Sequence, residues 1–265
     1  FQESHLDAAV IGISGGIDSA LVLGLAHAAA SQPGSRIKRI EPIFLPVYNE
    51  GATGQGDAYL RAKEWVGLLG YDLRHIDLTS VHQAYAQAFG QDASGWAAGQ
   101  MVSYARTPAL YYATSLLSDQ GLGSIVLGTT NYDEGSYIGY FGKASDGMVD
   151  LQCLSDWHKH EVRWFANYCG VSQSIQKVAP TGDMFDGRTD ESVFGFTYDA
   201  LEYDLRSRYS ALPPVEELSQ RVDELHQYNG HKYLAYSPAI HLNSVLEYPR
   251  SFEGHWKFKT WTPHD

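Results

Sequence analysis

The residues best suited to chemistry follow the first apolar segment of the chain. Residues 8–13 are apolar and partly β-branched, which predicts a short buried strand. The strand ends in the segment Gly12-Ile13-Ser14-Gly15-Gly16-Ile17-Asp18-Ser19. Its glycines let backbone N–H groups approach a phosphate, its two serines add hydroxyl donors, and its aspartate suits a Mg²⁺ ion that bridges phosphate oxygens. A helix predicted over residues 18–30 presents its positive end to the same anion.

Two widespread phosphate-binding motifs do not fit this segment. A Walker A loop requires a lysine that is missing here, and the dinucleotide fingerprint G-x-G-x-x-G is also absent. What remains is S-G-G-x-D-S, which resembles the pyrophosphate-binding loop of the ATP pyrophosphatases. The alternative is a helix-capping turn, in which Ser14 or Ser19 is a cap and Asp18 interacts favourably with the helix dipole.

A second group of polar residues follows a strand predicted over residues 123–127. It begins with Gly128-Thr129-Thr130-Asn131-Tyr132-Asp133-Glu134 and continues with Gly139-Tyr140-Phe141-Gly142-Lys143 and Asp146-Gly147-Met148-Val149-Asp150. Lys159, Pro180-Thr181-Gly182-Asp183, Asp190-Glu191, Gly195 and Tyr198-Asp199 come later. In this order, over about residues 8–205, the chain resembles the NAD synthetases, which amidate the nicotinate carboxylate of nicotinic acid adenine dinucleotide.

The resemblance implies roles for individual residues. Asp18 and Glu134 hold Mg²⁺ and form the catalytic set with Lys159, while Lys159 and Thr181 bind the ATP phosphates and Thr129 contacts ATP. The rest of the ATP site is Gly12, Ile13, Ser14, Gly15, Gly16, Ile17 and Ser19. The residues expected in the dinucleotide site are Arg106, Lys143, Asp150, His231 and Lys232. Taken singly, each lysine is as readily a solvated surface residue, and Arg106 a member of a surface ion pair.

The chain departs from the family pattern at several positions. Gly142 precedes the motif lysine where many members have threonine, and Pro108 stands where a second arginine is common. One extra residue lies between Glu134 and Gly139, and the segment from Ser237 to Leu242 is not the common bacterial ending. These departures bear on the acid substrate rather than on ATP.

Alternating strand and helix patterns predict a doubly wound α/β fold with a mostly parallel sheet and helices on both faces. We expect further strands over residues 37–45 and 71–76 and helices over residues 55–69, 80–89 and 97–117, the last kinked or broken near Thr107 by Pro108. Residues 1–265 are expected to form a single domain with a divergent tail from about residue 236. The loops at residues 91–95 and 183–190 are expected to order on ligand binding.

Composition restricts the partners and the compartment. The net charge of −12 disfavours extended nucleic-acid binding, and no apolar run is long enough to span a bilayer. Two cysteines without metal-ligand spacing favour a reducing, cytoplasmic compartment and disfavour zinc. No glutaminase domain is recognisable, so free ammonia, or ammonia from a separate glutaminase partner, is the expected nitrogen source. The resemblance also implies a homodimer.

Two alternatives remain open at this stage. The first is an ATP-pyrophosphatase amide synthetase that acts on a different carboxylate. The second is a non-catalytic nucleotide-binding subunit, although both of the carboxylates expected to bind metal are present.

Overall fold

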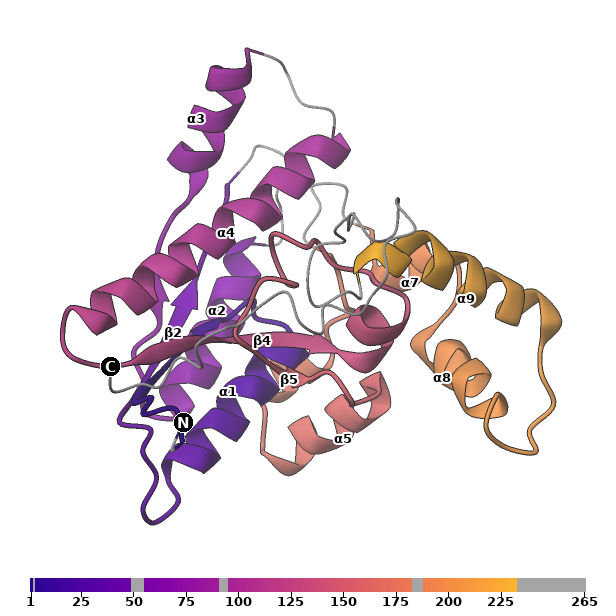
Figure 1. Cartoon of the computed structure of the whole chain (residues 1–265), viewed down its shortest axis with the longest axis horizontal. Helices are drawn as coiled ribbons and strands as arrows, with labels where there is room; N and C mark the ends of the chain where they lie inside the picture. Colours follow the sequence, from indigo (N-terminus) through magenta and orange to yellow (C-terminus); the bar gives the residue numbers. More distant parts are fainter. Residues whose placement is uncertain (2, 49–54, 91–94, 183–187, 233–265) are drawn as a thin grey trace, which may run out of the picture. The chain divides into compact units, whose positions relative to one another are not determined.

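One parallel sheet organises the chain. The computed structural model describes residues 1, 3–48, 55–90, 95–182 and 188–232, and within these residues five strands pair in the order β3-β2-β1-β4-β5 (Figure 1). The strands are β1 (Ala8–Gly12), β2 (Arg39–Phe44), β3 (Arg74–His75), β4 (Ser124–Asn131) and β5 (Leu151–Leu154). All of the pairings are parallel, which confirms the predicted fold class.

The central strand β1 lies where the strand order reverses. It pairs with β2 from Ala8↔Arg39 to Gly12↔Ile43, and on its other side with β4 from Ala8↔Ser124 to Ile11↔Leu127. The chain builds outward through β2 and β3 and then returns to add β4 and β5 beyond β1. In open α/β sheets, ligands bind at the carboxyl ends of the strands beside such a reversal. The predicted phosphate loop follows the end of β1, and the segment from Thr129 to Glu134 contains the end of β4 and the residues after it.

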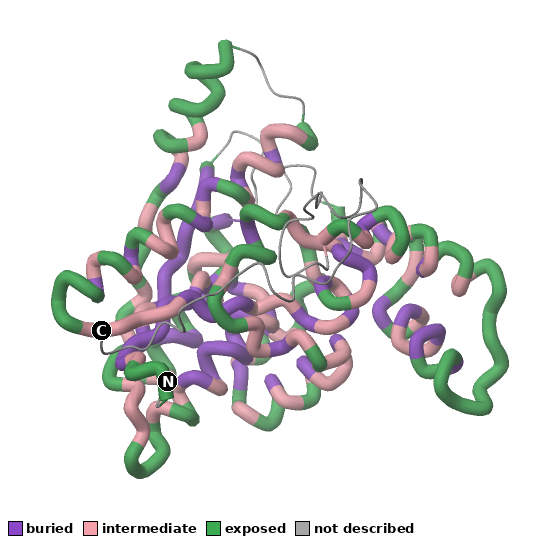
Figure 2. The backbone as a smooth tube through the Cα atoms, in the orientation of Figure 1, coloured by how far each residue is buried: buried purple, intermediate pink, exposed green. Residues whose placement is uncertain are grey.

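Helices cover both faces of the sheet. On one face α1 (Ile17–Ala30), α2 (Gln55–Leu68), α5 (Lys159–Tyr168) and α6 (Gln173–Gln176) bury an apolar core that includes Leu21, Trp65 and Val162. On the other face α4 (Gly95–Ser118) packs Val102 and Ala113 against the sheet, and α3 (Thr79–Phe89) adjoins it. Figure 2 shows the buried residues concentrated in the central strands and on the inner sides of α1 and α4, whereas β3 and α3 contain no buried residue.

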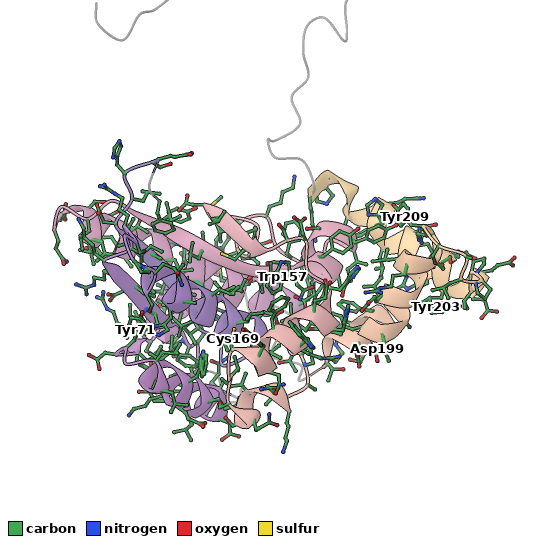
Figure 3. The ribbon with its side chains drawn as sticks, turned by 90° about the horizontal axis from the view of Figure 1, so that it is seen from below. Tyr71, Trp157, Cys169, Asp199, Tyr203 and Tyr209 are labelled. Carbon is green, nitrogen blue, oxygen red and sulfur yellow. The ribbon has the colours of Figure 1, made fainter. Side chains whose placement is uncertain are left out.

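A third core joins the segment after β4 to the last helices. A π-helix, η1 (Tyr132–Tyr137), directly follows β4. Ile138 packs with residues of α7 (Asp190–Phe194), α8 (Tyr198–Ser207) and α9 (Glu216–Asn229), which ends in the short 3₁₀ helix η2 (Gly230–Lys232). Asp199 and Tyr203 in Figure 3 mark α8. This core connects the π-helix to elements that follow it by more than fifty residues.

Several element predictions need correction. Strand β5 was missed, because four residues after a glycine-rich stretch give too short a pattern to distinguish from a loop. The strand predicted over residues 123–127 is too short at its end, because β4 continues for four further residues to Asn131 and the π-helix follows directly. β3 has two residues rather than six. α4 is one helix through Pro108, so of the predicted kink or break near Thr107 the break is wrong.

Some predictions lie outside the described residues. The chain divides into the units Phe1–Lys232 and Tyr233–Asp265, and the second unit contains the predicted tail. Residues 91–94 and 183–187, in the two loops expected to order with ligand, also lie outside. Within the described part, no helix is both long enough and apolar enough to cross a membrane, and the thiols of Cys153 and Cys169 are unpaired.

Candidate active site

A buried lysine gathers two carboxylates at the carboxyl ends of β1 and β4. The Lys159 ammonium Nζ lies 2.7 Å from Asp18 Oδ2 and 2.7 Å from Glu134 Oε1. The Lys159 side chain is only 1% exposed, while the Asp18 and Glu134 side chains are 20% and 15% exposed. The lysine is therefore enclosed, and the two carboxylates lie between it and solvent.

Local structure explains why these three side chains meet. Asp18 lies in the first turn of α1, Glu134 in the π-helix after β4, and Lys159 is the first residue of α5. Asn131, fully buried at the end of β4, links two of these elements. Its Nδ2 donates to Asp18 Oδ1 over 2.9 Å, and its Oδ1 accepts from the Glu134 backbone N–H over 3.1 Å.

The electrostatics reflect two acids that share one cation. Burial raises the pKa of Asp18, Lys159 opposes that shift, and the Glu134 charge adds to it. Burial would also raise the pKa of Glu134, but the ammonium of Lys159 and the hydroxyl of Tyr198 hold it below its usual value. The two carboxylates in turn raise the pKa of Lys159 despite its burial. The cluster is thus one negative charge in excess, which suits an additional cation.

A tyrosine extends the cluster to α7 and α8. The Tyr198 hydroxyl, on a residue only 1% exposed, donates to Glu134 Oε1 over 2.5 Å and lies 3.0 Å from Asp190 Oδ2. One hydroxyl carries a single proton, so only one of the two carboxylates can receive it. Burial and the nearby Glu134 charge raise the pKa of Asp190 to about 6, and its Oδ1 is buried without a hydrogen-bond partner.

The predicted phosphate loop has the backbone that its glycines imply. Gly15 has φ +78°, and a Cβ atom there would lie 2.3 Å from the carbonyl oxygen of Ala58. The Ser14 backbone N–H donates to Ser19 Oγ over 3.2 Å, and that hydroxyl donates to the Gly16 carbonyl over 3.1 Å. The loop is held in shape by its own serines, and α2 packs too closely for a larger residue at position 15.

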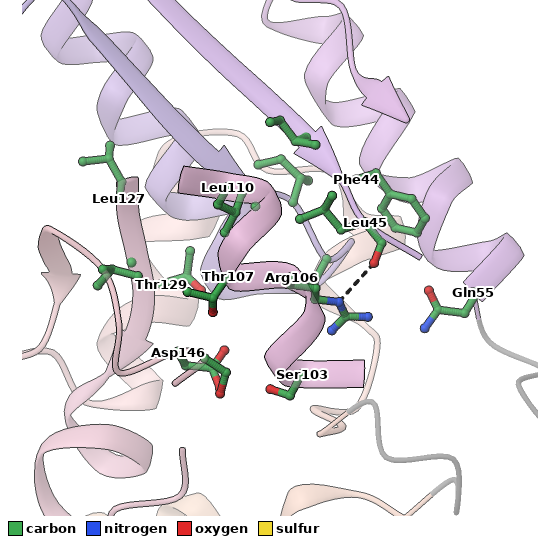
Figure 4. Close-up of a pocket in the computed structure, with 17 residues that line it drawn as sticks. Phe44, Leu45, Gln55, Ser103, Arg106, Thr107, Leu110, Leu127, Thr129 and Asp146 are labelled. Carbon is green, nitrogen blue, oxygen red and sulfur yellow. Dashed lines mark hydrogen bonds between the residues drawn. The ribbon is translucent and has the colours of Figure 1, made fainter. Parts of the chain in front are cut away.

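A pocket of about 130 Å³ opens beside this loop (Figure 4). Ser14, Thr129 and the start of α2 at Gln55 line it, together with apolar residues of β2. Arg106, from α4, also lines the pocket, and its Nε donates to the Leu45 carbonyl over 3.0 Å. Arg106, predicted for the dinucleotide site, therefore shares a pocket with Ser14 and Thr129, which were predicted for ATP. Asp146 lies across the same pocket and interacts electrostatically with Arg106.

The other predicted substrate residues fall in two places. Lys232 donates to the Gly139 carbonyl over 2.9 Å and lies 5.6 Å from the centroid of the Phe141 ring. Burial and the charge of Lys143 lower the pKa of Lys232, so the two lysines are near each other. His231 is exposed in the same short helix.

Asp150 and Thr181 do not join the Lys159 cluster. Asp150 Oδ2 accepts from the Val126 backbone N–H over 2.8 Å, and its Oδ1 accepts from the Tyr111 hydroxyl over 3.2 Å. In this structure the Asp150 carboxylate connects β4 with α4. Thr181 is exposed and forms an isolated antiparallel bridge with Thr189, just before α7.

Sequence reasoning missed the partners of the cluster. Asn131, Asp133 and His158 received no role, and Asp190 and Tyr198 stood only in segments that resemble the family. Asn131 and Asp133 lie at the carboxyl end of a buried strand, next to Thr129 and Glu134 in the sequence, which is the signal that could have found them. Nothing in one sequence pairs Tyr198 with Glu134, because 64 residues separate them.

Two carboxylates of the cluster could serve as metal ligands. Among the described residues, no group of three or more His, Cys, Asp and Glu side chains could hold a metal ion. Asp18 and Glu134 supply two carboxylates within reach of one cation, as the common contact with Lys159 demonstrates. Mg²⁺ is usually bound by one or two carboxylates together with phosphate oxygens and water, so this pair fits Mg²⁺ that arrives with a nucleotide.

The chain is similar to known proteins in sequence and in fold. The NH₃-dependent NAD⁺ synthetase of Methanococcoides burtonii is 34% identical over 203 residues, which are 76% of this chain and 72% of that protein. The solved NMN synthetase of Francisella tularensis is similar with a TM-score of 0.75 and 27% identity, over 90% of this chain and 92% of that chain. The NH₃-dependent NAD synthetase of Campylobacter jejuni shares the fold, with a TM-score of 0.66 and 22% identity over 90% and 91% of the two chains.

The family model for NAD synthase covers residues 1–233. That range contains the glycine loop, the pocket beside it, the lysine with its two carboxylates, and the lysines near Phe141. It confirms the resemblance predicted from the motifs: this chain belongs to the NAD synthase family.

Proposed function

We propose that the cluster of Asp18, Glu134 and Lys159 activates a nicotinate carboxylate with ATP. The chain amidates nicotinic acid adenine dinucleotide to NAD through an acyl-adenylate, using ammonia and releasing AMP and pyrophosphate. The observation that carries the site assignment is the shared contact of Lys159 with both carboxylates, next to a glycine loop shaped for phosphate. No protein nucleophile is needed, because the substrate carboxylate itself attacks the α-phosphorus.

The residues of the loop bind the leaving pyrophosphate. Gly12, Ile13, Ser14, Gly15, Gly16, Ile17 and Ser19 lie at the positive start of α1, where hydroxyls and backbone N–H groups of this segment would meet the phosphates. The N–H groups of Ile13 and Ser14 would not do so as they stand, because they donate to the Ile43 carbonyl and to Ser19 Oγ. Lys159 provides the compact positive charge that neutralises oxygens as the α–β bond breaks, since its ammonium lies beside this loop. Thr129 and Arg106, which share the pocket with Ser14, bind the rest of the nucleotide. Thr181, in the segment before α7, is also assigned to the ATP phosphates.

Mg²⁺ is part of this proposal. Asp18 and Glu134 would hold the ion against the phosphates, where it would supply Lewis-acid stabilisation of the negative oxygens. The excess negative charge of the cluster supports an added cation. The Lys159 ammonium stands between the two carboxylates in the structure, so a bound Mg²⁺–nucleotide requires it to move from carboxylate toward phosphate.

Lys143 and Lys232 are proposed to contact the anionic part of the acid substrate. Two neighbouring ammonium groups repel each other, and a bound anion relieves that repulsion. His231 belongs to the same short helix as Lys232, and Asp150 directly precedes β5 and accepts from the Val126 backbone N–H. We assign these two residues to the acid substrate together with Lys143 and Lys232.

A second acid substrate deserves a test. The NMN synthetase of F. tularensis is more similar to this chain, at a TM-score of 0.75 and 27% identity, than the C. jejuni NAD synthetase, at 0.66 and 22%. The departures at Gly142 and Pro108 lie in the segments that the family resemblance assigns to the acid substrate. We therefore propose nicotinic acid mononucleotide as the alternative substrate of the same site.

Three further features complete the proposal. Ammonia enters freely or from a separate glutaminase, because the NAD synthetases similar to this chain are named as NH₃-dependent. The two unpaired thiols support a cytoplasmic location. A homodimer is supported by α3, whose residues are all at least partly exposed and whose Val81, Tyr85 and Phe89 lie four residues apart along one apolar stripe.

Product analysis tests the function. The purified chain is incubated with ATP, Mg²⁺ and ammonium together with either the dinucleotide acid or the mononucleotide acid, and the amide is identified by mass spectrometry. NAD formed with a kcat/KM at least about tenfold above that for the mononucleotide supports the dinucleotide substrate; each tenfold is about 1.4 kcal/mol of transition-state discrimination. The reverse ratio supports the alternative, and no amide from either acid contradicts both.

A further inference from the structure

Asp133, the residue before Glu134, is buried with both carboxylate oxygens engaged. It is 0% exposed, its Oδ1 lies 2.7 Å from His158 Nδ1, and its Oδ2 accepts from the Lys159 backbone N–H over 2.7 Å. A buried carboxylate is costly unless it is well paired, so this position is not a passive surface residue.

Two consecutive residues of the π-helix, Asp133 and Glu134, both contact Lys159. Asp133 holds the backbone of Lys159, while Glu134 holds its ammonium group. Just before these residues, the Tyr132 backbone N–H donates to the carbonyl of Trp157 over 2.9 Å (Trp157 is labelled in Figure 3). Lys159 is therefore fixed at both ends by adjacent residues of the π-helix.

Helix capping alone does not explain the contact between the Asp133 carboxylate and the Lys159 backbone N–H. Helix α5 already has a capping box, in which Glu161 Oε2 accepts from the His158 backbone N–H over 2.8 Å. Asp133 adds a second contact from a different element, and it falls on the one residue of the helix whose side chain reaches Asp18. The lysine side chain has four carbons and many rotamers, so its ammonium is placed only if its backbone is placed.

We propose that Asp133, together with His158, is a positioning residue that fixes the first residue of α5 so that Lys159 reaches the phosphates. This inference rests on the proposed role of Lys159 at the ATP phosphates. A displacement of about 1 Å at a reacting group can cost about 100-fold in rate, which is the scale of effect that a positioning contact can have.

A double-mutant cycle tests the inference. Asp133→Asn, Lys159→Gln and the double variant are compared by kcat/KM for ATP and by the inhibition constant of pyrophosphate. We expect Asp133→Asn to lower kcat/KM about 10- to 100-fold and to weaken pyrophosphate inhibition. In the Lys159→Gln background the same change should cost less than about twofold, because the group it positions is gone.

Glu161→Ala is the matched control. It removes the other cap of the same helix end without touching Lys159, so it should lower the melting temperature while changing kcat/KM by less than about threefold. If Asp133→Asn lowers kcat/KM by the same factor in the wild-type and Lys159→Gln backgrounds, the positioning role is overturned. An unchanged pyrophosphate inhibition constant in Asp133→Asn would overturn it as well. Either result leaves the proposed role of Lys159 intact. Unchanged kinetics in Lys159→Gln would instead refute the proposed role of Lys159, and the inference with it.

A second variant keeps the inference testable if Asp133→Asn does not fold. If Asp133→Asn melts below the assay temperature, the cycle is repeated with His158→Asn, which leaves the Asp133 carboxylate bound to the Lys159 N–H but removes its other partner. We expect a loss of about 3- to 10-fold in kcat/KM that disappears in the Lys159→Gln background. The same loss in both backgrounds would contradict the positioning role.

Discussion

The Lys159 ammonium donates to the Asp18 carboxylate over 2.7 Å, although 141 residues separate the two positions in the chain. The contact joins the start of α1 to the start of α5 across the carboxyl ends of the central strands. Asp18 is also one of the two residues proposed to hold Mg²⁺, so the lysine and the metal would compete for this carboxylate. In the ligand-free structure Lys159 partly neutralises the two acids.

Removal of the lysine charge should favour metal binding without nucleotide. In Lys159→Met, Asp18 and Glu134 lose the cation that competes with a metal, so the ligand-free chain should bind Mn²⁺ at least about tenfold more tightly, a change of about 1.4 kcal/mol. Titration followed by electron paramagnetic resonance measures the affinity. Lys63→Met, at an exposed lysine beside Tyr59, is the control. Equal Mn²⁺ affinity in wild type and Lys159→Met would contradict a shared cation position.

The glycine loop should tolerate no side chain at Gly15. Gly15→Ala places a Cβ atom against the Ala58 carbonyl at a positive φ, so nucleotide affinity should fall at least about tenfold as the loop or α2 shifts. Gly70→Ala is the matched control, because Gly70 has φ +80° with nothing near its Cβ position. The control should lose roughly 1 kcal/mol of stability and keep its affinity for Mg-ATP. Equal nucleotide affinity in the two variants, by isothermal titration calorimetry, would count against a close-packed loop.

Asp190 should make stability depend on pH. Its folded pKa of about 6 is above its unfolded value, so the folded state binds the proton more tightly and the stability that Asp190 contributes is lost as pH rises from about 4 through 6. Asp190→Asn keeps a neutral side chain at every pH. Relative to wild type it should gain roughly 2 to 3 kcal/mol between pH 4 and pH 7.5. Urea unfolding at both pH values, without metal or nucleotide, measures the difference; a constant difference would refute the raised pKa.

The apolar stripe on α3 should hold two copies together. Phe89→Glu adds a charge at a side chain that is 79% exposed in the isolated chain, so it should shift a dimer toward monomer without lowering the melting temperature of the monomer. Sedimentation velocity over a range of concentrations measures the assembly. Leu60→Glu, at an exposed leucine on α2, is the control. A wild-type chain that sediments as a monomer at all concentrations would remove the basis of the proposed homodimer.

Local patterns predicted the parts of the fold that depend on neighbouring residues. An apolar run predicts strand β1, the glycines predict the turn after it, and the Ala- and Leu-rich segment predicts helix α1. All three signals lie within the first thirty residues of the chain. The long helix α4 was predicted within two residues at its start, but not its continuity through Pro108. A proline in a helix removes one hydrogen bond and crowds the preceding turn, and tertiary packing of Val102 and Ala113 on either side offsets that cost here.

Contacts between distant segments could not be predicted in the same way. The family resemblance brought Asp18, Glu134 and Lys159 into one site, but neither composition nor periodicity relates positions so far apart. The support around them, from Asn131, Asp133 and Tyr198, depends on how the π-helix meets α5 and α8. Buried polar groups must find partners, and only the folded arrangement determines which ones they find.

Acid-dependent release of pyrophosphate tests the central claim most directly. Pyrophosphate is measured with ATP, Mg²⁺ and ammonium, with and without the nicotinate dinucleotide, in wild type, Asp18→Ala and the control Asp119→Ala at an exposed position after α4. We predict release that requires the acid, persists in Asp119→Ala and falls at least about 100-fold in Asp18→Ala. Release that ignores the acid, or that survives in Asp18→Ala, would contradict the account.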